Sequence, residues 1–305
     1  MRKCTTALSG QMLWDTIQQM SREHIKFVGR AIKFSMQTPD KAKDVILARL
    51  LNTVYAKDVS INGVDICIFL PDMVSGNMYL RNTYEPEVTS FMESCLNESD
   101  TFWDIGPHIG YHSLQAKRIA GTNSKVLAFE PTPRTYEWLT MNAESNGIQT
   151  YNCALGSKDG FTEITDFGVM KSGWNTIVSP RFDSNLPPES YLNATNHQVL
   201  IRTIDSLVEN DNLPVPNLIK IDAENAEMDI LRGAKNTLQL HKPTLIIEAG
   251  AQGRDEGNST MACLDLLCKY GYEFKVYEEG AIVDLGDRNP DQWQNILCIA
   301  TNLQG

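Results

Sequence analysis

Along the first eighty or so residues, the apolar positions change from a helical period to a period of two. A helix with one apolar face is predicted by the spacing of Ile46, Leu47, Leu50, Leu51 and Val54. Residues 58–70 instead alternate around Asn62-Gly63, which is typical of a β-hairpin turn. We expect residues 1–57 to be helical and residues 1–83 to form an N-terminal extension of helices and a hairpin. Because an apolar helix face needs a partner, the extension would pack on the main domain or form a homodimer.

From residue 84 onward, short apolar runs of strand length alternate with stretches of helical pattern. The expected strands lie at residues 101–105, 125–130, 150–154, 218–222, 244–248, 272–277 and 295–301. This alternation predicts an α/β fold over residues 84–305, with a mostly parallel sheet and helices on both faces. Residues 226–238 are expected to form one helix, residues 72–82 a loop, and residues 156–198 a long irregular insertion.

Composition narrows the classes of partner. The chain has 305 residues, enough for one large α/β domain with an extension, and a net charge of −11. Nucleic acid is not an expected partner, because phosphate binding relies on lysine and arginine. No apolar run reaches the length of a membrane span, and the N-terminus lacks the apolar run of a signal peptide. The seven scattered cysteines suit reduced thiols, so we expect a cytoplasmic protein with no membrane partner.

The first predicted strand of the main domain runs into a glycine turn and then a helix. These three parts form a ligand cradle, because the first helical N–H groups are unpaired and glycine lets a ligand approach the backbone. Asp104 precedes the turn, and Gly106 and Gly110 stand four residues apart. A dinucleotide fingerprint would need glycine where His108 and Tyr111 stand, so the pattern disfavours NAD and FAD.

A second acidic position follows the next predicted strand, which ends at Glu130. A carboxylate about 20 residues beyond the glycine turn is where such folds hold ribose hydroxyls. With Asp104 ahead of the turn, the pattern favours a nucleoside without a pyrophosphate, and S-adenosylmethionine (SAM) fits. Asp104 would contact the methionine end of SAM or orient the glycine loop, unless it only caps the turn.

Several longer motifs occur in order between residues 84 and 250. They are Tyr84-Glu85-Pro86-Glu87, Asp104-Ile105-Gly106-Pro107-His108-Ile109-Gly110, Phe129-Glu130-Pro131, Ile219-Lys220-Ile221-Asp222-Ala223-Glu224-Asn225-Ala226-Glu227, Leu231-Arg232-Gly233-Ala234 and Ile246-Ile247-Glu248. Together they resemble the FkbM-type family of SAM-dependent methyltransferases. The resemblance implies a Rossmann-like class I methyltransferase sheet with SAM as its cofactor. It also implies a SAM pocket formed by Asp104, Gly106, His108, Gly110, Ser113, Glu130 and Asp222.

The family's motifs do not specify which chemical group is methylated. Its members include O-methyltransferases of sugar or polyketide hydroxyls and enzymes that methylate amide nitrogen in peptides. The resemblance therefore implies methyl transfer to a hydroxyl of a glycan or small natural-product metabolite, with amide N-methylation of a peptide as the alternative. Pro107 and Asn225 stand where the family usually has Ala and Gly, which motivates a rival: a non-catalytic binding protein of the same fold. His108 disfavours a dehydrogenase, the third possibility.

Three further carboxylates, Asp222, Glu224 and Glu248, stand at or just beyond the ends of neighbouring predicted strands, where ligands bind in such sheets. We expect Asp222 to position the methyl acceptor or accept its proton, with Glu224 and Glu248 close enough to raise its pKa. A divalent cation on the same oxygens is the second interpretation, and a helix cap is the third. No metal is expected, because no motif demands one.

Within the long insertion, Trp174 and Asn175 are candidates for binding the substrate. An aromatic face suits a sugar or a flat substrate. Equally, Trp174 could serve only to fasten the insertion to the domain.

Overall fold

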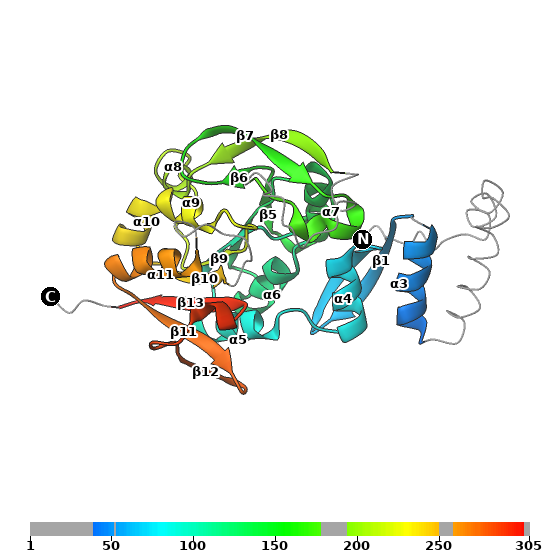
Figure 1. The fold of residues 1–305 in the computed structure, drawn as a ribbon, viewed down its shortest axis with the longest axis horizontal. Helices are drawn as coiled ribbons and strands as arrows, with labels where there is room; N and C mark the ends of the chain where they lie inside the picture. The colour runs from blue at the N-terminus through cyan, green and yellow to red at the C-terminus, as the bar shows by residue number, and fades with distance from the viewer. Residues whose placement is uncertain (1–38, 52, 178–193, 250–258, 302–305) are drawn as a thin grey trace. The chain divides into compact units, whose positions relative to one another are not determined.

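The computed structural model describes residues 39–51, 53–177, 194–249 and 259–301 (Figure 1). The chain folds into two compact units. The first comprises residues 1–84 together with residues 167–173, and the second comprises residues 85–166 and 174–305. The first unit is therefore built from two stretches that lie far apart in sequence. The helical structure expected before residue 39 lies outside the described residues.

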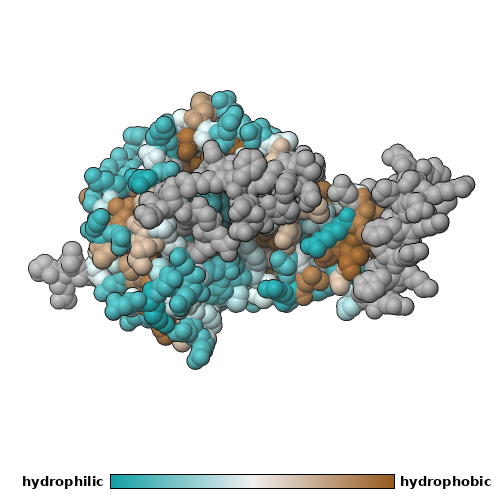
Figure 2. All heavy atoms as spheres, in the orientation of Figure 1, coloured by the Kyte–Doolittle hydropathy of each residue, from teal (hydrophilic) through white to brown (hydrophobic). Residues whose placement is uncertain are grey.

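The first unit contains a β-hairpin packed against two helices. Its elements are α3 (Asp40–Leu51), β1 (Tyr55–Ile61), β2 (Val64–Leu70), α4 (Met73–Arg81) and most of the 3-10 helix η2 (Val169–Trp174). The predicted hairpin is confirmed, because β1 and β2 pair antiparallel and both Asn62 and Gly63 take the left-handed conformation of a two-residue turn. Strand β1 begins inside the stretch that was expected to be helical up to residue 57, so that end of the helical prediction is wrong. In Figure 2 this unit shows brown, apolar surface.

The loop expected at residues 72–82 is wrong, because α4 occupies most of it. The Asp72 carboxylate caps this helix by accepting a hydrogen bond from the Ser75 N–H at 2.7 Å. The other oxygen of Asp72 accepts a bond from the Ser172 hydroxyl at 2.6 Å, a partner one hundred residues away. Asn82 ends the helix in the left-handed conformation. The local cap of this helix is thus also held by a contact from a distant part of the chain.

The second unit is organised around an eight-stranded sheet with the order β12-β11-β13-β10-β9-β3-β4-β5. Neighbouring strands from β10 to β5 run parallel, whereas β13 is antiparallel to β10 and β11, and β12 is antiparallel to β11. The strands are β3 (Thr101–Ile105), β4 (Lys125–Phe129), β5 (Gln149–Tyr151), β9 (Leu218–Ile221), β10 (Thr244–Glu248), β11 (Tyr272–Glu278), β12 (Ala281–Asp284) and β13 (Asn295–Ala300). The predicted α/β fold with a mostly parallel, Rossmann-like sheet is confirmed.

Helices connect these strands and pack on them. They are α5 (Pro86–Cys95), α6 (Tyr111–Ala120), α7 (Pro133–Ala143) with the 3-10 turn η1 (Glu144–Asn146), α8 (Ile204–Glu209), α9 (Glu227–Arg232), α10 (Lys235–Leu240), α11 (Thr260–Lys269) and the 3-10 turn η5 (Pro290–Gln292). Helix α6 contacts β3 and β4, and α5 contacts β10 and β13. The prediction of a single helix at residues 226–238 is wrong, because the helix is interrupted between α9 and α10. At this break Gly233 lies so close to Gly156 that an added Cβ would stand 2.0 Å from its carbonyl oxygen.

A smaller three-stranded sheet has the order β6-β8-β7, formed by β6 (Ala154–Leu155), β7 (Gly160–Asp166) and β8 (Thr195–Arg202). The irregular insertion expected at residues 156–198 is therefore wrong in part, because it contains β7 and the start of β8. Strand β7 alternates between exposed and more buried positions, and its Ile164 joins Ala154, Val199 and Ile201 in a small apolar core. Residues 178–193 of the insertion lie outside the described residues.

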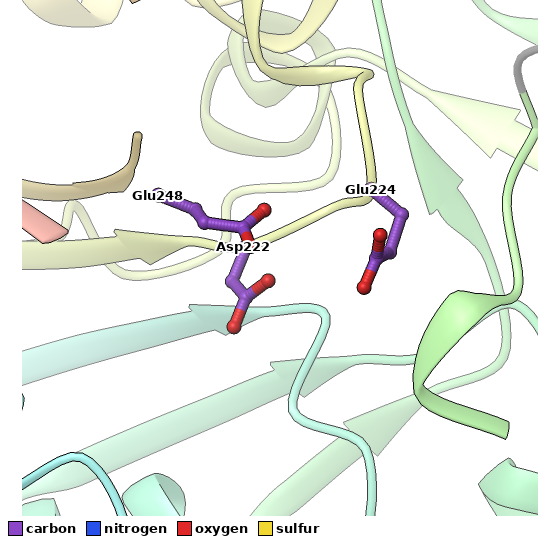
Figure 3. A group of neighbouring side chains, drawn as sticks. All are labelled: Asp222, Glu224 and Glu248. Atoms are coloured by element: carbon purple, nitrogen blue, oxygen red, sulfur yellow. The ribbon is translucent and has the colours of Figure 1, made fainter. Parts of the chain in front are cut away.

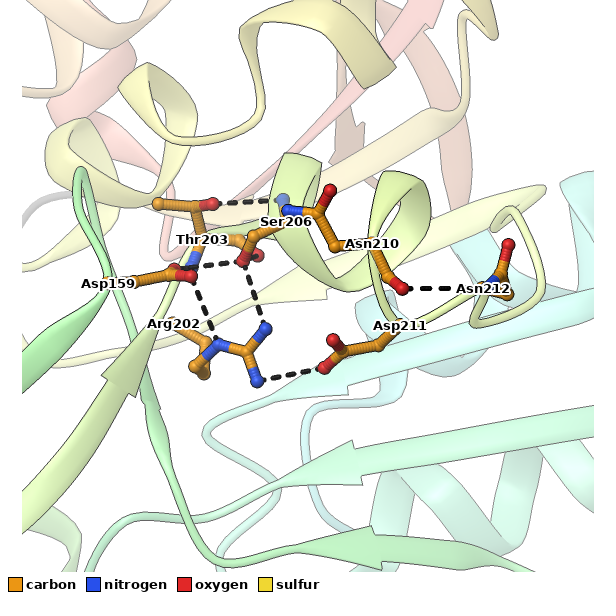
Figure 4. Close-up of polar contacts among 7 residues, drawn as sticks. All are labelled: Asp159, Arg202, Thr203, Ser206, Asn210, Asp211 and Asn212. Carbon is orange, nitrogen blue, oxygen red and sulfur yellow. Dashed lines mark hydrogen bonds and ion pairs between the residues drawn. The ribbon is translucent and has the colours of Figure 1, made fainter.

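A network of charged and polar side chains fastens this smaller sheet to the start of α8 (Figure 4). Asp159, in the turn before β7, accepts hydrogen bonds from the Thr203 N–H at 2.7 Å and the Ser206 hydroxyl at 2.8 Å. Arg202 contacts Asp159 at 3.3 Å and Asp211 at 2.8 Å. These bonds fix the turn that leads into β7.

The central strands are held by aromatic packing. Strand β3 is buried along its whole length, and its Trp103 ring lies 5.0 Å from Phe129 on β4. Phe129 stacks on Tyr151 of β5, also at 5.0 Å. The carboxyl ends of these strands are thereby fixed relative to one another. Among the described residues, no helix is long and apolar enough to span a membrane.

Candidate functional site

The glycine turn after β3 brings two backbones into direct contact. Gly106 has φ +77°, and a Cβ there would lie 1.7 Å from the carbonyl oxygen of Asp222. The Asp222 N–H donates to the Ile105 carbonyl at 3.0 Å, so the end of β9 is fastened to the end of β3. His108 and Gly110 are also left-handed, and α6 begins directly after Gly110. The turn therefore presents a helix N-terminus beside the ends of β3 and β9.

Asp104 lies behind this turn and is completely buried. One of its carboxylate oxygens accepts a hydrogen bond from the Ser113 hydroxyl at 2.6 Å. Its other oxygen, Oδ1, has no hydrogen-bond partner among the described residues. Burial raises the pKa of Asp104, while the charges of Lys220 and His112 and the bond from Ser113 oppose that rise. A buried, unfilled acceptor of this kind suits a ligand that brings a hydrogen-bond donor.

Glu130 follows β4 and is buried against the next turn. Its Oε1 accepts the Thr132 N–H at 2.9 Å, and the Thr132 hydroxyl and the His108 N–H also bond to this carboxyl group. Burial nevertheless raises the pKa of Glu130 to about 7. The proton on this group is therefore in balance near neutral pH.

Three carboxylates predicted as catalytic candidates converge at the same edge of the sheet (Figure 3). Asp222 follows β9, Glu224 lies in the turn after it, and Glu248 is the last residue of β10. Each offers an oxygen within 4.8 Å of the others, and all three side chains are half-buried. Glu224 and Asn225 have φ +49° and +80°, a left-handed turn that residues with a Cβ seldom adopt. This arrangement can accept protons, bind a polar group or hold a cation.

Lys220 belongs to the site although the sequence-based prediction gave it no role. It stands on β9 with 2% of its side chain exposed, and its ammonium lies 2.6 Å from Asp222 Oδ2. Burial lowers the pKa of Lys220, but the charges of Asp222, Glu85 and Asp104 outweigh it and raise the pKa above its usual value. Lys220 therefore places a positive charge directly beside the Asp222 carboxyl group. A lysine within an otherwise apolar strand was the available signal.

Glu85 and His112 form a second buried pair that the prediction did not assign. The Glu85 carboxylate lies 2.8 Å from His112 Nε2 and accepts a bond from Gln294 at 2.7 Å. Burial raises the pKa of Glu85, but the bond with His112 and the charge of Lys220 outweigh it, and the pKa falls below its usual value. The motif that contains Glu85 entered the prediction only as part of the family resemblance.

One of the two candidates from the insertion, Asn175, contacts the turn that follows Glu130, and its neighbour Thr176 contacts the turn that contains Glu224. Asn175 Nδ2 donates to the Thr132 hydroxyl at 3.3 Å. The hydroxyl of the next residue, Thr176, donates to the Glu224 carbonyl at 2.7 Å. Trp174 precedes them and is 37% exposed. The structure thus brings this segment to the predicted cofactor and catalytic residues.

The strand order, the glycine turn and the acid at the end of the neighbouring strand define a Rossmann-like, class I methyltransferase fold. The protein family described as Methyltransferase FkbM domain matches residues 104–274, more than half of the chain, and the chain belongs to that family. This confirms the resemblance seen in the sequence motifs.

Individual relatives share a modest part of the sequence. The chain is 28% identical over 176 residues to the hexuronic acid methyltransferase AglP of Haloferax volcanii, covering 56% of this chain and 65% of that protein. It is 34% identical over 142 residues to Methyltransferase 1 of Beauveria bassiana, covering 43% and 56%. The chain therefore spans somewhat more than half the length of these relatives. A solved structure of a methyltransferase FkbM from Methylobacillus flagellatus shares 16% identity with a TM-score of 0.41, covering 91% of this chain and 60% of that one.

Proposed function

We propose that this protein transfers a methyl group from SAM to a hydroxyl of a glycan or small natural-product metabolite. The proposal is carried by one observation: the buried carboxyl groups of Asp104 and Glu130 stand at the carboxyl ends of adjacent strands, beside the glycine turn. A nucleoside with a cationic amino-acid end would use both groups. Membership of the methyltransferase family supports this choice of ligand.

The residues present fit SAM. Glu130 would accept hydrogen bonds from the two ribose hydroxyls, and the left-handed turn from Gly106 to Gly110 would let the cofactor approach the backbone. Asp104, held by Ser113, would offer its unfilled oxygen to the methionine amino group. SAM supplies a methyl group already activated on a sulfonium. The protein therefore needs mainly to position the acceptor and take up its proton.

The carboxylate cluster would do that work. Lys220 holds one oxygen of Asp222, so the Asp222 carboxyl group is fixed in place as a hydrogen-bond acceptor suited to positioning a hydroxyl. Glu224 and Glu248, which lie within reach of it, would share the acceptor's proton. A sugar hydroxyl is favoured as the acceptor because one relative is named a hexuronic acid methyltransferase.

Isothermal titration with SAM and with S-adenosylhomocysteine (SAH) tests the proposal directly. We expect both to bind, and circular dichroism on the same sample shows that the protein is folded. If neither ligand binds at millimolar concentration to folded protein, the methyltransferase proposal is wrong. Binding of NADH without SAM would indicate a dehydrogenase instead. SAM binding with no methylation across a broad panel of hydroxyl and amide acceptors would favour a non-catalytic binding protein.

A further inference from the structure

The segment Trp174–Thr176 is anchored to the smaller sheet by backbone hydrogen bonds. The Thr165 N–H donates to the Thr176 carbonyl at 2.9 Å, and the Thr176 N–H donates back to the Thr165 carbonyl at 3.3 Å. Thr165 lies on β7, which is paired along its length with β8. Two backbone hydrogen bonds thus tie Thr176 to β7.

On one side, the segment acts on the proposed ribose-binding carboxyl group. Asn175 Nδ2 donates to the Thr132 hydroxyl at 3.3 Å, and Thr132 is completely buried. The Thr132 hydroxyl also bonds to Glu130. A hydroxyl has a single proton, so when its oxygen accepts from Asn175 that proton is directed to Glu130. Asn175 therefore orients a group that holds Glu130 in position.

On the other side, the segment acts on the carboxylate cluster. The Thr176 hydroxyl donates to the Glu224 carbonyl at 2.7 Å. Glu224 and Asn225 are both left-handed, a conformation that persists only where surrounding contacts hold it. Fixing this carbonyl fixes the turn, and the turn directs the Glu224 side chain toward Asp222 and Glu248.

We infer that Asn175 and Thr176 are positioning residues that couple the cofactor side of the site to its carboxylate cluster. The inference rests on the proposed function, since it takes Glu130 as the ribose ligand. Asn175 acts through Thr132, and Thr176 acts through the Glu224 backbone. Because the two residues are adjacent, loosening one anchor loosens the other. This role differs from the direct contact with substrate that the sequence suggested for Asn175.

Titration calorimetry with SAH tests the coupling without any methyl acceptor. Asn175→Ala should weaken SAH binding by roughly 2- to 12-fold, the range expected for losing one hydrogen bond. Thr176→Val, which removes the hydroxyl and keeps the shape, should weaken it by roughly 2- to 5-fold within the same range, and Thr176→Ser should restore it. Asn196→Ala is the matched control, because this asparagine bonds to Thr165 on the surface of the same sheet. It should leave SAH affinity unchanged.

The double variant Asn175→Ala with Thr176→Val decides whether the two residues act together. If they form one coupled segment, the double variant should weaken SAH binding by less than the product of the single effects. If the two single effects on SAH affinity simply multiply in the double variant, the coupling is wrong. It is also wrong if folded Asn175→Ala or Thr176→Val protein has a lowered melting temperature but unchanged SAH affinity. Failure of the unaltered protein to bind SAH would overturn the proposed function as well, so the two failures are distinguishable.

Discussion

Two charged networks in the second unit have similar chemistry and different surroundings. Lys220, whose side chain is 2% exposed, pairs with Asp222. The charges of Asp104 and Glu85 also raise the pKa of Lys220. Arg202 pairs with Asp159 and Asp211, whose side chains are 44% and 40% exposed. Water screens the second network, whereas the first must offset the loss of hydration by its own contacts.

The two networks also differ in how completely their oxygens are used. Asp159 receives hydrogen bonds from Thr203, Ser206 and Arg202 (Figure 4), and these outweigh its partial burial and lower its pKa. Asp104 receives one bond on one oxygen, and its pKa is raised. At the surface, the hydrogen bonds to Asp159 fix a turn. In the interior, Asp104 keeps an oxygen that can accept a hydrogen bond from a ligand. Perturbed and buried groups of this kind mark functional sites more often than surface pairs do.

The largest expected effect is on turnover in Asp222→Asn. This change keeps the shape of the side chain but removes its charge, so it should lower the rate of methyl transfer by about 10²–10⁴ while SAM binding stays within a few-fold. The rate is measured as SAH formed with an accepted hydroxyl substrate. If Asp222 only caps the following turn, the variant loses stability and keeps its turnover. Full activity in folded Asp222→Asn protein would exclude both a base and a metal-ligand role.

The two cations should differ sharply in their contribution to stability. Lys220→Met leaves buried carboxylates without their cation and should lower the free energy of unfolding by about 3–5 kcal/mol. Arg202→Met, the matched change in the exposed network, should cost about 0–1 kcal/mol. Urea unfolding followed by circular dichroism measures both. Equal losses in the two variants would mean that burial does not separate the networks.

Glu130→Ala should weaken SAM binding with the fold intact. The change would remove the two charge-assisted hydrogen bonds that we propose to the ribose, each worth about 1.5–3 kcal/mol, so affinity should fall by an order of magnitude or more. Calorimetry gives the dissociation constant, and the melting temperature serves as the control for folding. A dissociation constant equal to that of the unaltered protein would place the ribose elsewhere.

A smaller effect is expected from pH. In the proposed site, ribose hydroxyls would donate to the ionised form of Glu130, whose pKa burial raises to about 7. Below pH 7 the free protein must lose a proton to bind, so SAM affinity should fall by up to about tenfold per pH unit as pH drops, and level off above neutrality. Glu130→Gln should flatten this part of the profile. An equal slope in both proteins would assign the titration to another group.

No effect is expected from removing divalent cations. SAM carries a methyl group that is already activated, and Lys220 supplies a positive charge to Asp222, so we expect methyl transfer to proceed without a metal. Turnover after dialysis against EDTA should equal that before it. Activity lost to EDTA and restored by magnesium or manganese would instead assign Asp222, Glu224 and Glu248 as metal ligands.

The elements that could be predicted from the sequence are those specified by a few neighbouring residues. The Asn62-Gly63 turn, the buried strand before Asp104 and the acid at the end of β4 are each recognisable within a few residues. The glycine turn could be placed for the same reason. Periodicity and turn chemistry act over such distances, so the α/β fold followed from them.

Contacts between distant residues were not predictable in this way. Glu85 meets His112 across 27 positions, and Asn175 meets Thr132 across 43. The Asp72 carboxylate that caps α4 also accepts a bond from Ser172. The charge of Glu85, from another part of the chain, raises the pKa of the buried Lys220. Nothing near any of these residues specifies its partner, because the fold alone brings them together. The convergence of Asp222, Glu224 and Glu248 was predictable only because parallel strands end at one edge.

The divided composition of the first unit has a consequence for synthesis on the ribosome. Asp72 in this unit bonds to Ser172, which is synthesised one hundred residues later. Gly173 also packs closely in this unit, since an added Cβ there would stand 2.9 Å from the Val74 side chain. The unit therefore cannot complete its packing until residue 173 has emerged, by which time β3, β4 and β5 of the other unit are already outside. A single proteolytic cut after residue 84 would likewise leave residues 167–173 on the wrong fragment.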